Sequence, residues 1–287
     1  MKLLLGIHGY VGKKVWESLY QKRIPSTYLD DIKYIDIIGS GGVKRLEDYI
    51  SKYHIDTLIN CVGYVGHPNV DACEDNKDIC YTLNYSLPLI LAKICNELDI
   101  TYCHVGTGCI YNGDNGGDGF TEEDIPNIKD KMSFYSVCKY QAEKHLGEYS
   151  NVYNLRLRMP FSKDMNCKRN ILNKLRTYKY ILSAKNSLTN IDEYVDNLIY
   201  CITNDVEYGT YNMCNEGGIT SEEIIILLRS YGLLNKPSVA FLNEEEFREK
   251  VTSIHRSSCV LNVQKAKNAG MKFKDIKTSI KDCLNLL

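Results

Sequence analysis

Short apolar runs alternate with longer amphipathic stretches through the first half of the chain, which is typical of strand–helix–strand units. The apolar runs predict strands at residues 2–7, 34–38, 57–62, 101–105 and 152–157. Apolar residues at helical spacing predict helices at residues 11–22 and 86–98. Because strands joined by helices pair in parallel, we expect an α/β fold with a Rossmann-type doubly wound parallel sheet.

The alternation loosens after Pro160, where a strand is predicted at residues 210–214 and a helix at residues 221–231. Ser221 is followed by two glutamates, which favours a helix start at this position. We therefore expect a Rossmann domain at residues 1–160, to which later segments of the chain return. Residues 161–287 are expected to form mainly a smaller C-terminal lobe.

Composition changes this picture little but excludes several classes of function. Hydrophobic residues make up 44% of the 287 and charged residues 25%, with a formal net charge of −1. This balance provides no overall attraction to nucleic acid or to an anionic membrane. No apolar run reaches the ~18 residues of a membrane span, and the N-terminal run ends at Gly6, too early for a signal peptide. We expect a cytoplasmic protein.

The twelve cysteines are scattered, several lie within apolar runs, and none forms a C-x-x-C pair. The six histidines form no H-x-x-H or H-E-x-x-H pair. This pattern predicts reduced, buried thiols, with neither a disulfide framework nor a bound metal.

Three glycines in the pattern G-x-x-G-x-x-G follow the first predicted strand and begin a helix. They are Gly6, Gly9 and Gly12. Glycine lets the backbone turn tightly and approach a pyrophosphate, and a helix N-terminus offers N–H groups to the phosphates. We expect a dinucleotide here, in contact also with the intervening residues His8, Tyr10 and Val11. The alternative is a tight turn that binds no ligand.

The residues after the second predicted strand should select the dinucleotide. Asp36 lies within that strand, whereas Ser40, Lys44 and Arg45 follow it, and a basic residue there accepts a 2′-phosphate. We therefore predict NADPH as the cofactor, with Arg45 as the preferred phosphate ligand; the alternative is that both cations are only solvated. The third predicted strand ends in three residues expected to lie along the adenine ribose: Cys61, Val62 and Gly63.

Tyr135 and Lys139 lie four residues apart, which puts both side chains on one face of a helix. A tyrosine can protonate a developing alkoxide when a nearby ammonium lowers its pKa from about 10. The same spacing occurs at Tyr10 and at Tyr140, but only Tyr135 follows the strand that ends near Thr107, whose hydroxyl would hold a carbonyl oxygen. We predict these three residues as a reductase set, with Tyr135 and Lys139 also in contact with the cofactor; the alternative is a surface tyrosine on an amphipathic helix.

Together these residues resemble an extended short-chain dehydrogenase/reductase. The following segments occur in order: GYVGHPNVDACE (63–74), GTGCIY (106–111), GFTEEDIPN (119–127), SFYSVCK (133–139), LRLRMPFS (155–162), RNILNKL (169–175), NSLTNIDE (186–193), YNMCNEGGITSEEI (211–224) and HRSSCVLN (255–262). They resemble the reductase half of plant rhamnose synthases and its free-standing relatives in giant viruses, the UDP-4-keto-6-deoxyglucose 3,5-epimerase/4-reductases. GSGGVKRLED (39–48) resembles the cofactor-phosphate loop of that group, whereas the loop at 112–119 is shorter than in the plant form.

The resemblance implies two reactions in one pocket. A 4-keto group acidifies the protons at C3 and C5, so one enzyme group removes a proton and a second returns one on the opposite face. In this family the two groups correspond to Cys109 and Lys174, with the acid and the base unassigned. NADPH then reduces C4 while Tyr135 protonates the oxygen. The alternatives are a buried apolar thiol for Cys109 and a solvated helix lysine for Lys174.

The resemblance also implies a UDP-linked 4-keto sugar held by the smaller, substrate-binding lobe, although the sequence does not choose between UDP and dTDP. Candidate ligands of the diphosphate are Arg169, Asn170 and Arg256, since guanidinium groups pair with phosphate oxygens. Asn69 and Glu74 are candidates beside the sugar. A separate 4,6-dehydratase would supply the substrate, and a homodimer in the cytoplasm (the host cytoplasm for a viral protein) is expected by analogy.

Two other functions remain open. One is a reductase that acts only on 4-keto-rhamnose, which the Cys109–Lys174 pair argues against. The other is a non-catalytic, NADP-binding regulatory subunit with the same fold, which the retained Tyr135–Lys139 pair argues against.

Overall fold

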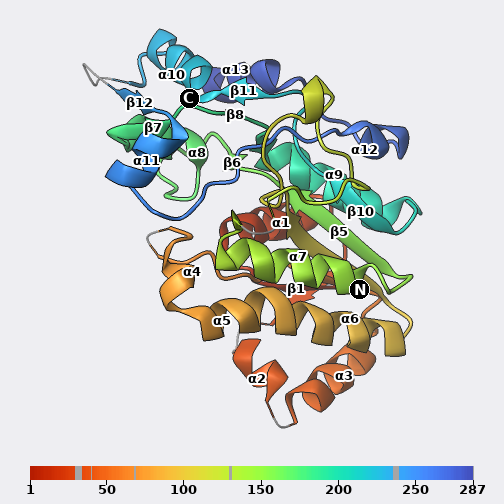
Figure 1. The fold of residues 1–287 in the computed structure, drawn as a ribbon. Helices are drawn as coiled ribbons and strands as arrows, with labels where there is room; N and C mark the ends of the chain where they lie inside the picture. Colours follow the sequence, from red (N-terminus) through yellow and green to blue (C-terminus); the bar gives the residue numbers. More distant parts are fainter. Residues whose placement is uncertain (30–33, 40, 68, 129–130, 235–238, 287) are drawn as a thin grey trace. The chain divides into compact units, whose positions relative to one another are not determined.

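The structure is a computed structural model that describes residues 1–287 except 30–33, 40, 68, 129–130, 235–238 and 287. The chain divides into two compact units, which are described separately (Figure 1). Unit 1 comprises Met1–Thr107, Met132–Arg156 and Val195–Tyr211, and unit 2 comprises Gly108–Lys131, Leu157–Tyr194 and Asn212–Leu287. The predicted functional division at residue 160 stays a prediction, and each unit is assembled from three separate segments.

Unit 1 is built on a six-stranded sheet with the order β10-β5-β4-β3-β1-β2. Its strands are β1 (Lys2–Leu5), β2 (Ser26–Tyr28), β3 (Thr57–Asn60), β4 (Thr101–Thr107), β5 (Val152–Leu157) and β10 (Gly209–Asn212). β1 pairs in parallel with β2 on one side and with β3 on the other, and β3 pairs in parallel with β4. The direction of the chain crossing therefore reverses beside β1, which is where open α/β sheets bind ligands.

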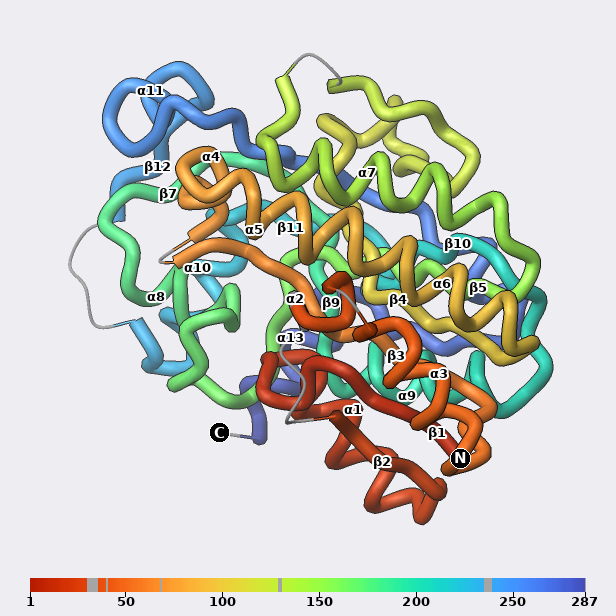
Figure 2. The backbone as a smooth tube through the Cα atoms, turned by 90° about the horizontal axis from the view of Figure 1, so that it is seen from below, coloured from red at the N-terminus to blue at the C-terminus, as the bar shows by residue number. Residues whose placement is uncertain are grey.

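Helices flank this sheet. They are α1 (Tyr10–Gln21), α2 (Tyr34–Ile38), α3 (Gly42–Lys52), α4 (Ala72–Asp75), α5 (Lys77–Tyr81), α6 (Leu87–Glu97), α7 (Phe134–Leu146) and most of α9 (Ile191–Thr203). A π-helical turn at Thr82–Ser86 joins α5 to α6. Figure 2 shows α6 and α7 side by side on one face of the sheet and α1 on the opposite face. Four of the five strands predicted in the first half are confirmed as β1, β3, β4 and β5, and the two predicted helices are confirmed as α1 and α6.

The predicted strand at residues 34–38 is wrong, because these residues form helix α2 and the second strand is β2. β2 has only three residues and directly follows Pro25, so it shows no alternation that a pattern search could detect. A short apolar run fits a buried helix as well as a strand, and Ile37 is indeed fully buried in the core. Asp36 therefore lies on a helix. Residues 30–33, which follow β2, lie outside the described residues.

Unit 2 contains short paired strands and small helices around its own apolar core. β6 (Pro160–Phe161) pairs with β9 (Thr189–Asn190), β7 (Tyr180–Leu182) with β12 (Ala240–Leu242), and β8 (Lys185–Asn186) with β11 (Ile219–Thr220). Its helices are α8 (Ile171–Thr177), α10 (Ser221–Ser230), α11 (Glu244–Lys250), α12 (Gln264–Asn268) and α13 (Ile276–Asn285). Helix α10 is capped by Thr220 rather than Ser221, because Thr220 and Glu223 form a reciprocal capping box.

Candidate active site

The loop after β1 carries the three predicted glycines and is packed too closely for side chains. Gly6 has a φ of +87°, and a Cβ on it would lie 2.8 Å from the carbonyl carbon of Cys61. A Cβ on Gly12 would lie 2.0 Å from the carbonyl oxygen of Gly6. Helix α1 then begins at Tyr10 with no side-chain cap and no acidic residue in its first turn. Its N-terminal N–H groups can take the phosphates of a dinucleotide, so this loop fits that cofactor.

The same loop lies against the end of β3, where the ribose contacts are predicted. The predicted residues Cys61 and Val62 are the nearest neighbours of Gly6 across the sheet. Burial raises the pKa of the Cys61 thiol to about 12, against the attraction of the Lys139 ammonium. The structure therefore brings together the glycine loop, the end of β3 and Lys139. His8 is exposed in this loop, and Tyr10 and Val11 are half-buried in the first turn of α1.

Lys44 and Arg45 lie in the first turn of α3 and do not follow a strand. Lys44 forms an ion pair with Asp48 at 2.9 Å, and its side chain is 73% exposed. Nη1 of Arg45 lies 3.3 Å from the place of a Cβ on Gly41. Ser40 lies outside the described residues. The contact of Lys44 and Arg45 with a 2′-phosphate stays a prediction.

Lys139 is held by two acceptors on β4. Its ammonium donates to the carbonyl oxygen of Val105 at 2.7 Å and lies 3.0 Å from Nε2 of His104, and the lysine side chain is buried. Burial, with repulsion from Lys139, holds the pKa of His104 well below its usual value. The imidazole is therefore neutral, and its Nε2 accepts from the ammonium. Tyr135 lies one helical turn earlier on α7, and Thr107 ends β4 with its side chain buried.

Two residues predicted beside the sugar make local contacts in unit 1. Oδ1 of Asn69 accepts from the backbone N–H of Asp71 at 2.8 Å, which closes the turn before α4. Oε1 of Glu74 accepts from the backbone N–H of Phe134 at 2.7 Å, at the first residue of α7. Glu74 thus fixes the start of the helix that carries Tyr135. Contact of either side chain with a sugar stays a prediction.

Cys109 comes two residues after β4 and belongs to unit 2. Its Sγ accepts a hydrogen bond from Nη1 of Arg158 at 2.8 Å. Nη2 of Arg158 donates to Oδ1 of Asn186 at 2.5 Å and to the carbonyl oxygen of Ser257 at 2.6 Å. Arg158 is only 3% exposed, so a buried positive charge touches the thiol.

Lys174 lies on α8 in unit 2, half-buried and close to two further cations. Burial, with repulsion from Arg169 and Arg256, holds the pKa of Lys174 below its usual value. The structure thus brings together three residues that were predicted separately from the sequence. Such a cluster of cations is suited to a phosphate group and makes Lys174 a better proton donor than a solvated lysine.

Asn170 caps α8, because its Oδ1 accepts from the backbone N–H of Leu172 at 3.0 Å. Its Nδ2 donates to the carbonyl oxygens of Ser162 and Asp164, at 2.7 and 2.8 Å, and the residue is fully buried. A contact with substrate would have to replace one of these bonds. Binding of substrate by Asn170 stays a prediction.

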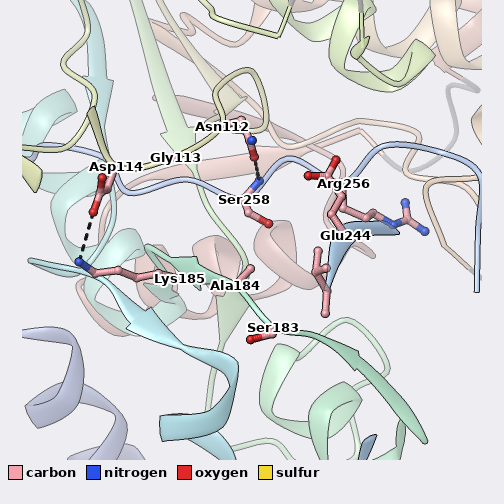
Figure 3. A pocket seen from close by; sticks show the side chains of 10 residues that line it. Asn112, Gly113, Asp114, Ser183, Ala184, Lys185, Glu244, Arg256 and Ser258 are labelled. Atoms are coloured by element: carbon pink, nitrogen blue, oxygen red, sulfur yellow. Dashed lines mark hydrogen bonds and ion pairs between the residues drawn. The ribbon is translucent and has the colours of Figure 1, made fainter. Parts of the chain in front are cut away.

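A cavity of about 320 Å³ in unit 2 is lined in part by Arg256 and Lys185 (Figure 3). Its wall is fixed by an ion pair between Lys185 and Asp114 at 3.6 Å and by a hydrogen bond from Ser258 N to Asn112 Oδ1 at 3.2 Å. The cavity also presents backbone and hydroxyl groups of the segment that follows β7. The lining also contains the carboxylates of Asp114 and Glu244, so it is mixed in charge, with hydrogen-bonding groups that suit a polar ligand.

The sequence interpretation missed His104 and Arg158. A weak signal for each is present: His104 interrupts the apolar run of β4, and Arg158 is the second arginine in the Leu-Arg-Leu-Arg alternation of β5 and its extension. Charged residues in a strand that is buried on both faces require partners. The identity of those partners depends on contacts across 35 residues for His104 and 49 for Arg158.

None of the twelve cysteines, all of which the structure describes, takes part in a disulfide bond. Within the described ranges, no group of three or more possible ligands is arranged to hold a metal ion. Over the same ranges, the helices are too short or too polar to cross a membrane.

Comparison with known proteins agrees with this architecture. The chain matches the model of the RmlD substrate binding domain over residues 1–287. A bifunctional dTDP-4-dehydrorhamnose 3,5-epimerase/dTDP-4-dehydrorhamnose reductase from Arabidopsis thaliana is 32% identical, over 97% of this chain and 90% of the relative. The chain also matches trifunctional proteins of Arabidopsis thaliana, and the match spans about a third of their length, 34% for one of them.

Two solved structures share the fold. The crystal structure of the L780 UDP-rhamnose synthase from Acanthamoeba polyphaga mimivirus superposes with a TM-score of 0.89 at 28% identity, covering 100% of this chain and 99% of that one. A dTDP-4-dehydrorhamnose reductase from Bacillus anthracis in complex with NADP superposes with a TM-score of 0.80 at 18% identity, covering 100% of this chain and 98% of that one. The chain therefore belongs to the RmlD substrate binding domain family, a family of extended short-chain dehydrogenase/reductase-like, NADPH-dependent oxidoreductases of nucleotide sugars.

Proposed function

We propose that this chain is an NADPH-dependent 3,5-epimerase and 4-ketoreductase that converts UDP-4-keto-6-deoxy-D-glucose to UDP-L-rhamnose. A separate 4,6-dehydratase would supply the substrate, and the enzyme would work as a cytoplasmic homodimer. The observation that carries the proposal is the presence of two sets of proton-transferring side chains. Tyr135 and Lys139 form one set in unit 1, and Cys109 and Lys174 form the other in unit 2. A simple reductase requires only the first set.

The reductase set acts on the carbonyl oxygen at C4. NADPH, when bound, supplies the hydride to this carbon. The hydroxyls of Thr107 and Tyr135 hold the oxygen, and Tyr135 gives its proton to the alkoxide that develops. The ammonium of Lys139, fixed by Val105 and His104, stabilises the phenolate that remains.

The second set inverts C3 and C5 before reduction. One group takes the proton from the carbon, and the electron pair of the broken C–H bond moves toward the C4 oxygen as an enolate. The other group gives a proton to the opposite face of the same carbon, which inverts it. A thiol beside a buried guanidinium and a lysine with a lowered pKa are suited to these two tasks.

The nucleotide diphosphate would lie against the cations of unit 2. Arg169 and Arg256 can each form paired hydrogen bonds with phosphate oxygens, and the cavity beside Arg256 would take the rest of the nucleotide (Figure 3). Asn170 would lie beside the diphosphate, and Asn69 and Glu74 would lie beside the sugar. The names of the plant and mimivirus relatives support a rhamnose-forming reaction.

The test supplies the purified chain with UDP-4-keto-6-deoxyglucose and NADPH, identifies the sugar product, and repeats the reaction with the dTDP-linked sugar. UDP-L-rhamnose is the expected product. Reduction without inversion would reduce the function to that of a 4-ketoreductase. Absence of NADPH oxidation would contradict any enzymatic role and leave a binding subunit.

A pair of thiol variants separates the two activities. Cys109→Ser should lose inversion while its affinity for NADPH stays unchanged, because the residues predicted to bind the cofactor lie in unit 1. Cys167→Ser is the matched control, since Cys167 is also a half-buried thiol of unit 2. If Cys109→Ser forms rhamnose at the wild-type rate, Cys109 has no part in epimerisation.

A further inference from the structure

The buried guanidinium of Arg158 lacks an ordinary counterion. Its hydrogen-bond partners are the sulfur of Cys109, the amide oxygen of Asn186 and the carbonyl oxygen of Ser257. Within the described part of the chain, Arg158 forms no ion pair with a carboxylate, and its buried Nε has no hydrogen-bond partner. A buried charge without compensation costs several kcal/mol, so one of these neighbours should carry negative charge.

The other ionisable groups near Arg158 do not provide that charge. Burial raises the pKa of the Cys259 thiol, and it raises that of the Cys214 thiol to about 12, so both are neutral at pH 7. Glu122, whose charge acts on Cys214, is not among the hydrogen-bond or ion-pair partners that the structure describes for Arg158; its carboxylate accepts from the backbone N–H of Asn212. The sulfur of Cys109, at 2.8 Å from Nη1, is the remaining candidate.

We propose that Arg158 is a positioning residue that holds Cys109 as a thiolate at neutral pH. The guanidinium is itself fixed by Asn186 and Ser257, so its charge stays at the sulfur and cannot move into solvent. An arginine beside a cysteine favours the charged form of the sulfur in other reactive cysteines. The short distance between the nitrogen and the sulfur fits a charge-assisted hydrogen bond.

A thiolate at Cys109 would make this residue the base of the epimerisation and Lys174 the acid, an assignment that rests on the proposed function. The Cys109 thiolate accepts the proton from the sugar carbon and becomes a thiol, while the electron pair of the C–H bond forms the enolate. Lys174, with a pKa lowered by burial and by its neighbouring arginines, gives a proton to the opposite face and becomes an amine. Exchange of protons with water then restores both groups.

The thiolate is tested without any sugar, by the rate at which iodoacetamide alkylates Cys109 at pH values from 6 to 8.5, read by mass spectrometry of the Cys109 peptide. Below about pH 8.5, the alkylation rate of an ordinary thiol rises roughly ten-fold with each unit of increasing pH. A preformed thiolate reacts at a nearly constant rate over the same range. The ratio of the alkylation rates at two pH values does not depend on how accessible the sulfur is. A flat profile in the wild-type protein is expected, and a ten-fold rise per unit would overturn the proposal.

Variants identify the source of the effect. Arg158→Gln should restore the steep profile, and Arg158→Lys should give an intermediate one. Arg176→Gln is the matched control, because Arg176 is another arginine of unit 2 and donates to Met165 and Asn173 rather than to Cys109; its profile should stay flat. A flat profile in Arg158→Gln, or a steep one in Arg176→Gln, would overturn the role of the Arg158 charge. If the Arg158 variants do not fold, the wild-type profile alone decides.

Deuterium exchange separates this proposal from the proposed function. With the 4-keto sugar in D₂O, Lys174→Met should exchange the proton that Cys109 removes without inverting the carbon, and Cys109→Ser should not exchange it. A flat alkylation profile with neither exchange nor inversion in the wild-type enzyme would contradict the epimerase function alone. A steep alkylation profile would contradict the thiolate, whatever sugar is formed.

Discussion

The imidazole of His104 lies between the ammonium of Lys139 and a buried polar pair. Its Nε2 is 3.0 Å from Nζ of Lys139, while Nδ1 is 3.4 Å from the hydroxyl of Tyr102 and 3.3 Å from Nδ2 of Asn60. The amide of Asn60 also donates to Tyr102 at 2.9 Å. A neutral histidine can bridge the two sides only with its proton on Nδ1, so the network fixes the tautomer that accepts from Lys139.

Replacing His104 with leucine should therefore impair reduction more than cofactor binding. Loss of a hydrogen bond to a charged group costs about 1.5–3 kcal/mol, so kcat for C4 reduction should fall roughly ten- to a hundred-fold while the Kd of NADPH changes little. His104→Asn keeps an acceptor and should recover part of the rate. Tyr102→Phe should have a smaller effect, because it removes the acceptor of the Nδ1 proton and leaves Nε2 beside Lys139. A wild-type kcat in His104→Leu would show that Val105 alone positions Lys139.

The same histidine predicts how stability depends on pH. Its pKa is depressed in the folded protein, so the unfolded chain binds more protons below the ordinary value of about 6.5. The stabilisation is complete above that pH and is lost as the pH falls toward the folded pKa. The urea midpoint of the wild-type protein should therefore fall between pH 6.5 and 5, and less so in His104→Asn. An equal fall in both proteins would assign the pH dependence to other groups.

At the scale of elements, the start of α7 determines where Tyr135 lies. Ser133 caps the helix, with its Oγ accepting from the backbone N–H of Ser136, and the carboxylate of Glu74 accepts from the backbone N–H of Phe134. These contacts satisfy N–H groups that a helix start leaves without partners, and the acidic group also favours the positive end of the helix. Tyr135 follows in the next position.

Glu74→Ala should destabilise the protein by about 1 kcal/mol and lower kcat for reduction, because the first turn of α7 loses an acceptor. Glu74→Gln keeps an amide oxygen in the same place and should stay close to wild type. Asp75→Ala, at an exposed neighbouring position, is the control. Urea midpoints and steady-state kinetics provide the measurements. A rise in the KM of the sugar in Glu74→Gln, with unchanged stability, would instead indicate direct contact with the substrate.

The elements that the sequence predicted well are those with a long, one-sided pattern. β1, β3, β4 and β5 are runs buried in the sheet, and glycines follow the first two of them in the loops where the cofactor is predicted to bind. β2 was missed because three residues contain no period, and α2 was assigned as a strand because its apolar residues match both periods. The pattern of apolar residues therefore predicted those strands that are buried along nearly their whole length.

The candidate site follows the same rule. The glycine loop, Tyr135 with Lys139, and Thr107 carry signals in their own neighbourhood, and the structure brings the loop and Lys139 close to Cys61. The roles of His104 and Arg158 depend on contacts between segments far apart in the chain, which no local pattern contains.

At the scale of the molecule, the two units are interleaved, and this limits how the chain can be divided. Residues 195–211 come after most of unit 2 in the sequence but belong to unit 1. They carry most of α9 and β10, the strand at the end of the sheet beside β5. The hydroxyl of the buried Tyr153 on β5 donates to the carbonyl oxygen of Val206 in this segment.

A fragment that ends at residue 160 should therefore fail to fold. It lacks β10, which leaves β5 as an unprotected edge, and it lacks the buried side chains of Val195, Leu198 and Tyr211. Residues 1–211 are the matched control, because this fragment retains every segment of unit 1 although unit 2 is still incomplete. Circular dichroism during urea unfolding and titration with NADPH should show a cooperative transition and cofactor binding for 1–211 only. Tight NADPH binding by 1–160 would mean that the glycine loop and the end of β3 form the cofactor site without the rest of unit 1.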